Sequence, residues 1–514
     1  MENASPLWTT HELNIKTALS LRAFTPCVLA RYVLAGIDRA PYAGAAIPCF
    51  LFIHGVSMRK FRTLLGATLA GACALAVVPG TASAAPAAAP QQATADLADT
   101  TGAYYPVAPA RLMDTRSGLG GKTGKIGPLS KFDLQVTGRG GVPTSGVGAV
   151  VLNVTIANPT MDSFVTAYPA GEARPDASSV NFAKGWLGSN NVTVKIGSGG
   201  KVSIYNRNGS TDVVVDVVGF YAKDNSMTNR NGGQYEWFTP ERVFDTREDP
   251  EPKPTAGTTI EYSLSFDHDP ERNQHVKAFV LNLTAVAPAK DGFLTAWSGV
   301  GSKPVSSTVN YKANTNVPNL AFVQTTPCTG TDGCAAGVPK FRIYTSAAAH
   351  IIVDLVGVVD DGYGEWGMRF SPLSPTRILD SRVNLGTTGG VLSGGEVAKV
   401  TAPSAIVTDM TDVLAMNLTA VKPTRNTVLT VWPADADLPK PSASNLNPYA
   451  GQIVSNAVLG VIGPNDAFNV HNLTGDTHVV ADVVGTFYYP AAPAATLSGG
   501  AGKSKPQMVG SSHR

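Results

Sequence analysis

The chain repeats one ordered set of sequence blocks three times, and this repetition limits its fold more than any other feature. The first block is PARLMDTR at 109–116, PERVFDTR at 240–247 and PTRILDSR at 375–382. The last block is VDVVG, VDLVG or ADVVG, and it carries Asp216, Asp354 or Asp482. The blocks keep their order while the loops between them vary in length. We therefore expect three self-contained modules rather than a solenoid of short repeats.

Three further blocks lie between the first and the last in every copy. The second block carries an N-x-T triplet that begins at Asn153, Asn282 or Asn417. The third block ends in an aromatic residue, which is Tyr168, Trp297 or Trp432. The fourth block carries Asn181, Asn310 or Asn447, and Asn191, Asn319 and Asn456 follow it. Because all blocks recur in one order, the three copies are predicted to share one fold.

Short runs of β-branched and aromatic residues fill each copy, and clusters of Gly, Asn and Pro separate them. These runs predict strands, and no stretch shows the apolar period of an amphipathic helix. We interpret 196–205 and 204–215 as hairpins with Gly-containing turns. The expected fold class is all-β, with three tandem β-sandwich-like modules. A jelly-roll-like module or a small barrel is the alternative.

The block positions also predict the boundaries of the modules. We place module 1 at 104–222, module 2 at 236–358 and module 3 at 369–488. An Ala/Pro/Gln-rich linker is expected at 85–103 and a disordered tail at 489–514.

Residues 58–84 have the parts of a secretory signal peptide. Arg59, Lys60 and Arg62 precede an apolar stretch, and Ala82 to Ala84 fit the small-x-small cleavage pattern. A membrane anchor is the alternative, but the apolar stretch is short and no stop-transfer cluster follows it. We therefore expect an exported mature chain without a transmembrane segment, either extracellular or associated with the cell wall. Residues 1–57 match no module and are predicted to be an untranslated or disordered extension.

The cysteines and the charge balance limit the classes of partner. Only Cys328 and Cys334 follow the predicted cleavage site, and in an exported protein they predict a small-loop disulfide. A metal site would need further ligands nearby, so we expect neither a metal nor a cofactor. The formal net charge is +2 and no basic run occurs, which argues against nucleic acid as a partner.

The set PxR(L/I/V)xDTR, LNVT and VDVVGxY behind an Ala-rich signal resembles a module of secreted proteins from high-GC Gram-positive bacteria. There the module occurs in tandem or attached to exported hydrolases, and it is little characterised. The resemblance covers nearly all of 104–488, and it implies a cell-envelope or extracellular role. It transfers no catalytic residue. The second copy departs from the pattern by the cysteine insertion, and the third by DSR in place of DTR.

The repeated ionic residues have two interpretations. They are Arg111, Asp114, Arg116 and Asp216 in the first copy, Arg242, Asp245, Arg247 and Asp354 in the second, and Arg377, Asp380, Arg382 and Asp482 in the third. Strand alternation would place Asp114 and Arg116 on one face and Arg111 on the other. Because a buried charge must be paired, we interpret the sets as structural ties rather than as an active site.

Two other repeated features are weaker candidates. The aromatic residues Tyr168, Trp297 and Trp432 would stack on a sugar face if exposed, and would cap the core if buried. The N-x-T triplets match a glycosylation acceptor, although alternation makes them equally suitable for cross-strand hydrogen bonding. The bacterial type of signal favours the second interpretation.

The sequence contains no HExxH, GxSxG or P-loop pattern, so we predict a protein that is not an enzyme. Only His350 and His478 align between copies, and Asp212 takes their place in the first. The leading hypothesis is an adhesion or binding protein that offers three similar sites to a cell-wall or environmental polysaccharide, or to a surface protein. A structural coat protein is the first alternative. An extracellular hydrolase with an unrecognised site is the second.

Overall fold

The computed structural model describes residues 97, 99–248, 252–266, 269–364 and 366–490. These residues form strands and three short 3-10 helices, η1 (Ser198–Gly200), η2 (Pro270–Gln274) and η3 (Pro464–Asp466). The predicted all-β class is therefore confirmed. The predicted signal peptide and the extension at 1–57 lie outside the described residues. Within the part of the chain that is described, no helix is long and apolar enough to cross a bilayer.

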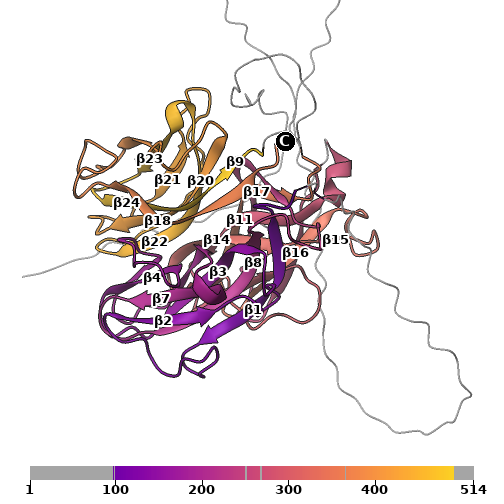
Figure 1. The fold of residues 1–514 in the computed structure, drawn as a ribbon, viewed down its shortest axis with the longest axis horizontal. Helices are drawn as coiled ribbons and strands as arrows, with labels where there is room; N and C mark the ends of the chain where they lie inside the picture. The colour runs from indigo at the N-terminus through magenta and orange to yellow at the C-terminus, as the bar shows by residue number, and fades with distance from the viewer. Residues whose placement is uncertain (1–96, 98, 249–251, 267–268, 365, 491–514) are drawn as a thin grey trace, which may run out of the picture. The chain divides into compact units, whose positions relative to one another are not determined.

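Module 1 is an antiparallel sandwich of two four-stranded sheets (Figure 1). Its strands are β1 (Tyr104–Asp114), β2 (Ser130–Gln135), β3 (Val147–Ala157), β4 (Ser163–Pro169), β5 (Val180–Phe182), β6 (Gly188–Lys195), β7 (Lys201–Asn206) and β8 (Asp212–Ala222). The strand orders are β1-β8-β3-β6 and β2-β7-β4-β5. This interleaved order is that of a jelly roll, in which successive strands, apart from β4 and β5, alternate between the two sheets.

Module 2 repeats the same topology. Its strands are β9 (Gln234–Asp245), β10 (Thr259–Ser263), β11 (Val276–Val286), β12 (Gly292–Trp297), β13 (Val309–Tyr311), β14 (Asn316–Gln324), β15 (Thr326–Pro327), β16 (Pro339–Thr345) and β17 (His350–Asp360). The sheet orders are β9-β17-β11-β14 and β10-β16-β12-β13, and β15 also pairs with β16.

Module 3 has the same topology over its described residues except that one strand is missing. Its strands are β18 (Arg369–Asp380), β19 (Val397–Thr401), β20 (Thr411–Val421), β21 (Leu429–Pro433), β22 (Ile453–Val461), β23 (Ala467–Asn472) and β24 (His478–Tyr488). The sheets are β18-β24-β20-β22 and β19-β23-β21. Where β5 and β13 lie in the other modules, the described part of module 3 has only a bridge between Leu429 and Leu446.

The interleaved topology corrects the hairpins expected at 196–205 and 204–215. β6 pairs with β3, whereas the following strand β7 pairs with β2 and β4 in the other sheet. β8 then returns to the first sheet beside β1 and β3. These Gly-containing turns thus connect strands of opposite sheets. The expectation was wrong because the turn sequence alone does not determine which strands pair.

Each module has its own apolar core, and a fourth cluster joins all three. This central cluster is formed by the outer faces of the sheets that contain β1, β9 and β18. Its aromatic contacts follow a cyclic pattern. The ring centroids are 5.1 Å apart for Tyr104 and Phe322, 4.8 Å for Tyr235 and Phe487, and 4.2 Å for Phe370 and Tyr221. The modules therefore pack around a pseudo-threefold axis, and the central strands β3, β11 and β20 of these sheets are buried on both faces.

The glycine that ends the VDVVG, VDLVG and ADVVG blocks lies beside this cluster. A Cβ atom would meet the Tyr104 hydroxyl at 2.1 Å if placed at Gly219. At Gly485 a Cβ would meet the Phe370 ring at 2.2 Å. The block retains glycine because the aromatic side chain of the neighbouring strand crosses directly over the backbone at this point.

The strands extend slightly beyond the expected module boundaries. Strands of module 2 run from Gln234 to Asp360 rather than over 236–358. Gly102, expected in the linker, accepts a backbone hydrogen bond from Phe370 at 2.9 Å. Tyr489, expected in a disordered tail, is buried in the central cluster, and its hydroxyl donates to Asp412 at 3.1 Å. Both residues therefore take part in the contacts that hold the three modules around the axis.

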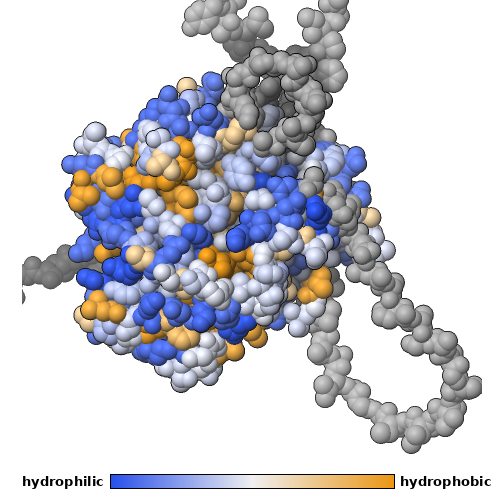
Figure 2. All heavy atoms as spheres, viewed as in Figure 1, coloured by the Kyte–Doolittle hydropathy of each residue, from blue (hydrophilic) through white to orange (hydrophobic). Residues whose placement is uncertain are grey.

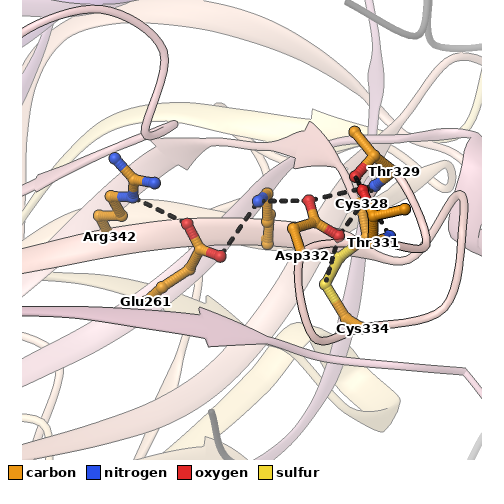
Figure 3. The surroundings of a disulfide bond; sticks show 8 residues. Glu261, Cys328, Thr329, Thr331, Asp332, Cys334 and Arg342 are labelled. Carbon is orange, nitrogen blue, oxygen red and sulfur yellow. Dashed lines mark hydrogen bonds and ion pairs between the residues drawn. A yellow bond between two sulfur atoms is a disulfide. The ribbon is translucent and has the colours of Figure 1, made fainter. Parts of the chain in front are cut away.

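The predicted disulfide joins Cys328 and Cys334 (Figure 3). It closes the loop between β15 and β16, where Asp332 accepts from the Thr329 amide at 3.0 Å. Lys340 links Asp332 to Glu261, with N–O distances of 2.7 and 3.0 Å. These contacts fasten the insertion to the outer sheet of module 2. Since both sulfurs are in the disulfide, the cysteines are not available as metal ligands.

Candidate functional site: the cleft between modules 2 and 3

One segment of each module lies against the next module around the axis. We name these segments, residues 305–310 of module 2, 442–447 of module 3 and 176–181 of module 1, the docking segments. They form the 1–2, 2–3 and 3–1 interfaces respectively. The asparagine of the N-x-T triplet donates to the docking segment in each case, over 2.6 Å from Asn153 to Ser307, 2.8 Å from Asn282 to Ser444 and 2.6 Å from Asn417 to Ser178.

A second asparagine extends this contact in a closed ring. The side-chain amides of Asn319, Asn456 and Asn190 donate to Asn153, Asn282 and Asn417 over 2.9, 3.4 and 2.8 Å. The equivalent of Asn319 and Asn456 is thus Asn190 and not Asn191 as expected, because β6 is offset by one residue from the sequence alignment. Asn191 instead donates its backbone amide to Asn319 at 2.9 Å. The N-x-T triplets are buried polar contacts between modules, which makes them inaccessible to a glycan in the folded chain.

The repeated ionic residues lie beside the docking segments. Arg111 donates to Asp216 at 2.9 Å and to the carbonyl of Val305 in module 2 at 2.9 Å. Arg116 donates to Asp114 at 2.9 Å, and Arg111 lies 3.5 Å from the same carboxylate. The placement of Arg111 on the opposite face from Asp114 was therefore wrong. The ladder of β1 shifts register between Arg111 and Met113, and this irregularity brings the two side chains together.

The two aspartates of each set have opposite pKa shifts. Burial raises the pKa of Asp216, Asp354 and Asp482 above the usual range, although each carboxylate has an arginine partner. Hydrogen bonds from Arg116 lower the pKa of the Asp114 carboxyl. Each set is bridged by one arginine and recurs in every module, which is the behaviour of a structural tie.

The 2–3 interface differs from the other two. Asp216 and Asp482 each accept a backbone amide from a docking segment, over 3.4 Å from Ser307 and 3.2 Å from Ser178. Asp354 is fully buried, and its Oδ2 has no hydrogen-bond partner among the described residues. The docking segment of module 3 thus makes fewer contacts with module 2 than its equivalents make with theirs.

A cleft of about 410 Å³ opens at this interface. Its lining includes Arg242, Arg247, Thr284 and Asn316 of module 2, and Asn426, Thr430, Lys440, Ser442, Ser444, Asn447, Tyr449 and His471 of module 3. A space lined mainly by modules 1 and 3 at the 3–1 interface measures only about 20 Å³. The volume of the 2–3 cleft is within the usual range for ligand sites.

Smaller side chains in module 3 explain the opening. The register of the outer sheets aligns His471 with Tyr205 and Tyr344, because all three residues pair with the threonine of the third block. The same register aligns Val428 with Phe164 and Phe293. In module 2, Phe293 and Tyr344 lie together, with ring centroids 6.0 Å apart. In module 3 the smaller side chains of Val428 and His471 do not fill the volume that Phe293 and Tyr344 occupy in module 2.

Two prolines open the interface further. Ser189 and Ser455 of β6 and β22 each exchange hydrogen bonds with a docking segment. Pro318 occupies the equivalent position of β14, and it has neither the hydroxyl nor an amide hydrogen. Pro448 follows Asn447 where Phe182 and Tyr311 end the short strands β5 and β13. Asn447 then lacks the contact that Asn310 makes to Thr155 at 3.1 Å, and its Oδ1 is buried without a partner among the described residues.

The cleft also contains an exposed cation. Arg174 of module 1 lies 4.7 Å from the Tyr205 ring centroid, and Lys303 of module 2 lies 4.5 Å from that of Tyr344. Lys440 follows the same pattern, with proline next and the docking serine four residues later, but faces His471 rather than a tyrosine. Burial, and secondarily the charge of Lys440, lowers the pKa of His471.

The three aromatic candidates of the third block are not in this cleft. Tyr168 and Trp297 are only 3% and 5% exposed, so their faces are not available to a sugar. Trp432 is half-buried and does not line the cleft. Sequence reasoning instead missed Lys440, His471 and Tyr449. The sequence feature that could have identified them is that the third copy differs here from the other two copies.

The aligned histidines do not form a catalytic set. His350 and His478 contact Thr246 and Ser381 at 3.2 and 3.0 Å. In module 1, Asp212 makes the equivalent contact to Thr115 at 3.1 Å. A carboxylate in module 1 thus makes the same contact to a hydroxyl as the imidazoles make in modules 2 and 3. The contact therefore joins two strands and does not depend on histidine chemistry.

No protein-family model matches the chain. No curated protein matches it either. Among the solved structures that match, two have low similarity to this chain. One is described as the triple jelly roll fold and turret assembly in an archaeal virus, with 9% identity, coverage of 76% of this chain and 90% of that one, and a TM-score of 0.14. The other is Sulfolobus Turreted Icosahedral Virus, with 8% identity, coverage of 72% and 87%, and a TM-score of 0.14. The assignment of a jelly roll rests on the strand order of this chain.

Proposed function

We propose that the chain is an exported, non-enzymatic binding protein that holds a segment of polysaccharide in the 2–3 cleft. The observation that carries this proposal is the cleft itself, which is lined by hydroxyl, amide and cationic side chains. Such groups donate and accept hydrogen bonds in the way that a polyhydroxylated ligand requires. Sugar hydroxyls would reach Asn447, Ser444 and Thr430 without displacing an existing module contact.

The proposal assigns one site to each chain rather than three. The 1–2 and 3–1 interfaces are occupied by their docking segments, so the equivalent surfaces serve to hold the body together. The disulfide is consistent with export, since such bonds persist in oxidising compartments. The described lining of the cleft contains no carboxylate that would act as a general acid or base, which supports binding without hydrolysis.

On the face shown in Figure 2, hydrophobic residues form separate patches bordered by hydrophilic ones. We propose the binding protein because the 2–3 cleft supports it directly.

Retention on insoluble polysaccharides and isolated cell walls tests the proposal. The unmodified chain should sediment with at least one of these materials. The variant Val428→Phe/His471→Tyr restores the side chains of the other modules and should be released. Leu129→Phe changes an exposed residue of module 1 and is the control for added aromatic surface. Absence of retention on every material would contradict the function, and undiminished retention of a folded double variant would contradict the site.

A further inference from the structure

The charges in the cleft indicate what kind of polysaccharide fits it. Lys440 is exposed at the cleft and has no ion pair among the described residues. Its equivalents Arg174 and Lys303 lie over tyrosine rings, whereas Lys440 has lost this partner. The positive charge of Lys440 is therefore available to a ligand.

The arginines on the opposite wall belong to module 2. Arg247 donates to Asp245 at 2.9 Å, and Arg242 donates to Asp354 at 2.9 Å. These two carboxylates lie behind the arginines and balance their charge, so the unbalanced charge is that of Lys440. The Nη2 atom of Arg242 remains without a hydrogen bond among the described residues, whereas the Nη2 of Arg111 donates to Val305. Two donor groups from different modules thus face one space.

The same space contains an acceptor that needs a donor. The Oδ1 of Asn447 is buried without a partner, and Ser444 and Thr430 lie beside it in the lining. An inorganic anion would engage the cations but would leave Asn447 unsatisfied. A neutral sugar would donate to Asn447 but would leave Lys440 without a counter-charge and would offer Arg242 no charged acceptor.

We infer that the cleft binds an acidic polysaccharide, a polymer that carries hydroxyl groups and an anionic group on the same repeating unit. This inference rests on the proposed function and specifies its ligand. The anionic group lies between Lys440 and Arg242, and a hydroxyl of the same or the next unit donates to Asn447. A carboxylate and a phosphodiester both meet these requirements, because each accepts charge-assisted hydrogen bonds from Lys and Arg.

Calorimetric titration of the full chain with short oligomers tests the inference. The probes are an oligogalacturonate, the same oligomer with every carboxylate converted to its methyl ester, and an oligomer of glycerol phosphate. The free acid should bind at least about tenfold more tightly than the ester, since the ester keeps the sugar hydroxyls but removes the negative charge. The affinity should also fall as the salt concentration rises. Tight binding of the glycerol phosphate oligomer would identify the charge as the shared feature, and its absence would identify the carboxylate.

Two matched variants locate the effect. Lys440→Gln should reduce the affinity for the acid about tenfold and leave the ester unchanged. Lys303→Gln, the equivalent change at the 1–2 interface, should leave both affinities unchanged. Equal affinity for acid and ester, or an unaltered Lys440→Gln, would overturn the inference. If no oligomer binds while the chain still sediments with polysaccharide, the acidic ligand is wrong and the proposed function stands. If sedimentation fails as well, the proposed function is wrong.

Discussion

At the 1–2 interface the docking segment of module 2 contacts module 1 along its length, whereas the equivalent segment of module 3 leaves a cleft against module 2. Both interfaces retain the asparagine contacts near the axis, with Asn153 and Asn282 donating over 2.6 and 2.8 Å. They differ farther from the axis, where the smaller side chains of Val428 and His471 and the prolines Pro318 and Pro448 occur on the 2–3 side. The contacts near the axis therefore hold the three modules together, and the residues farther from the axis can differ between the copies.

This difference shows how one repeated fold can combine stability and binding. Residues that recur in all copies form ties within and between modules. Residues that depart from the repeat, such as Pro318, Val428 and His471, open one interface of three. The binding function is thus expected at the residues that differ between the copies rather than in the repeated blocks.

The largest expected effect concerns the buried aspartates. Asp482→Ala should lower the free energy of unfolding by about 3–5 kcal/mol, because it leaves Arg377 and the Ser178 amide without their partner. Asp354→Ala should cost about 1–2 kcal/mol, since Asp354 receives no amide from module 3. Arg242 is also more exposed than Arg377, 33% against 18%, and water can replace part of its ion pair. Urea unfolding of both variants measures the difference.

Equal losses for the two variants would mean that the 2–3 interface is as tightly bonded as the others in solution. The contrast between an open and two closed interfaces would then be wrong.

A smaller effect is expected where proline replaces serine. Ser455→Ala should lower the free energy of unfolding by about 1 kcal/mol, because Ser455 exchanges hydrogen bonds with Ser179 and Asn181. Pro318→Ser should have the opposite sign and raise it by about 0.5–1 kcal/mol as new bonds form to Asn445 and Asn447. The same substitution should weaken polysaccharide retention by narrowing the cleft. Destabilisation by Pro318→Ser would show that the docking segment of module 3 does not approach β14 as closely as the docking segments of modules 2 and 1 approach β6 and β22.

Much of the fold was predictable from the sequence because it depends on local patterns. Runs of β-branched residues bounded by turn residues predicted the strands, and the block order predicted three copies. The pairing of Cys328 with Cys334 required only their spacing and the predicted export signal. The sequence left a sandwich and a jelly roll open, because connections between sheets and hairpins use similar turns.

The packing of the modules was harder to predict, although one signal was present. The run AVVLNVTIA, which lies in β3, does not alternate apolar and polar residues, and every residue of it is buried. Such continuous burial is typical of a sheet covered on both faces, and its second cover is the neighbouring module. The cleft depends on side-chain volume at positions brought together from β14, from β23 and from the residue that precedes β21. Those positions become comparable only once the register of the sheets is known.

The smallest expected effect is a pH dependence that only the open interface can show. His471 occupies the position of Tyr205 and Tyr344, and burial together with the charge of Lys440 lowers its pKa in the free protein. The charged groups that line the cleft around it are Lys440, Arg242 and Arg247, and Tyr449 is the other titratable side chain. A bound anion would favour the imidazolium and raise this pKa. Affinity for an acidic oligomer should therefore increase as pH falls through the raised pKa and level off below the pKa of the free protein.

The increase should be about threefold, which is the size expected from one partly screened charge beside the bound anion. Calorimetry in buffers of different ionisation enthalpy would also detect the proton taken up on binding. His471→Asn should abolish both the pH dependence and the proton uptake while it preserves a small polar side chain at the cleft. A pH dependence that persists in His471→Asn would assign the titration to another group, and affinity that falls with decreasing pH would exclude an anion beside His471.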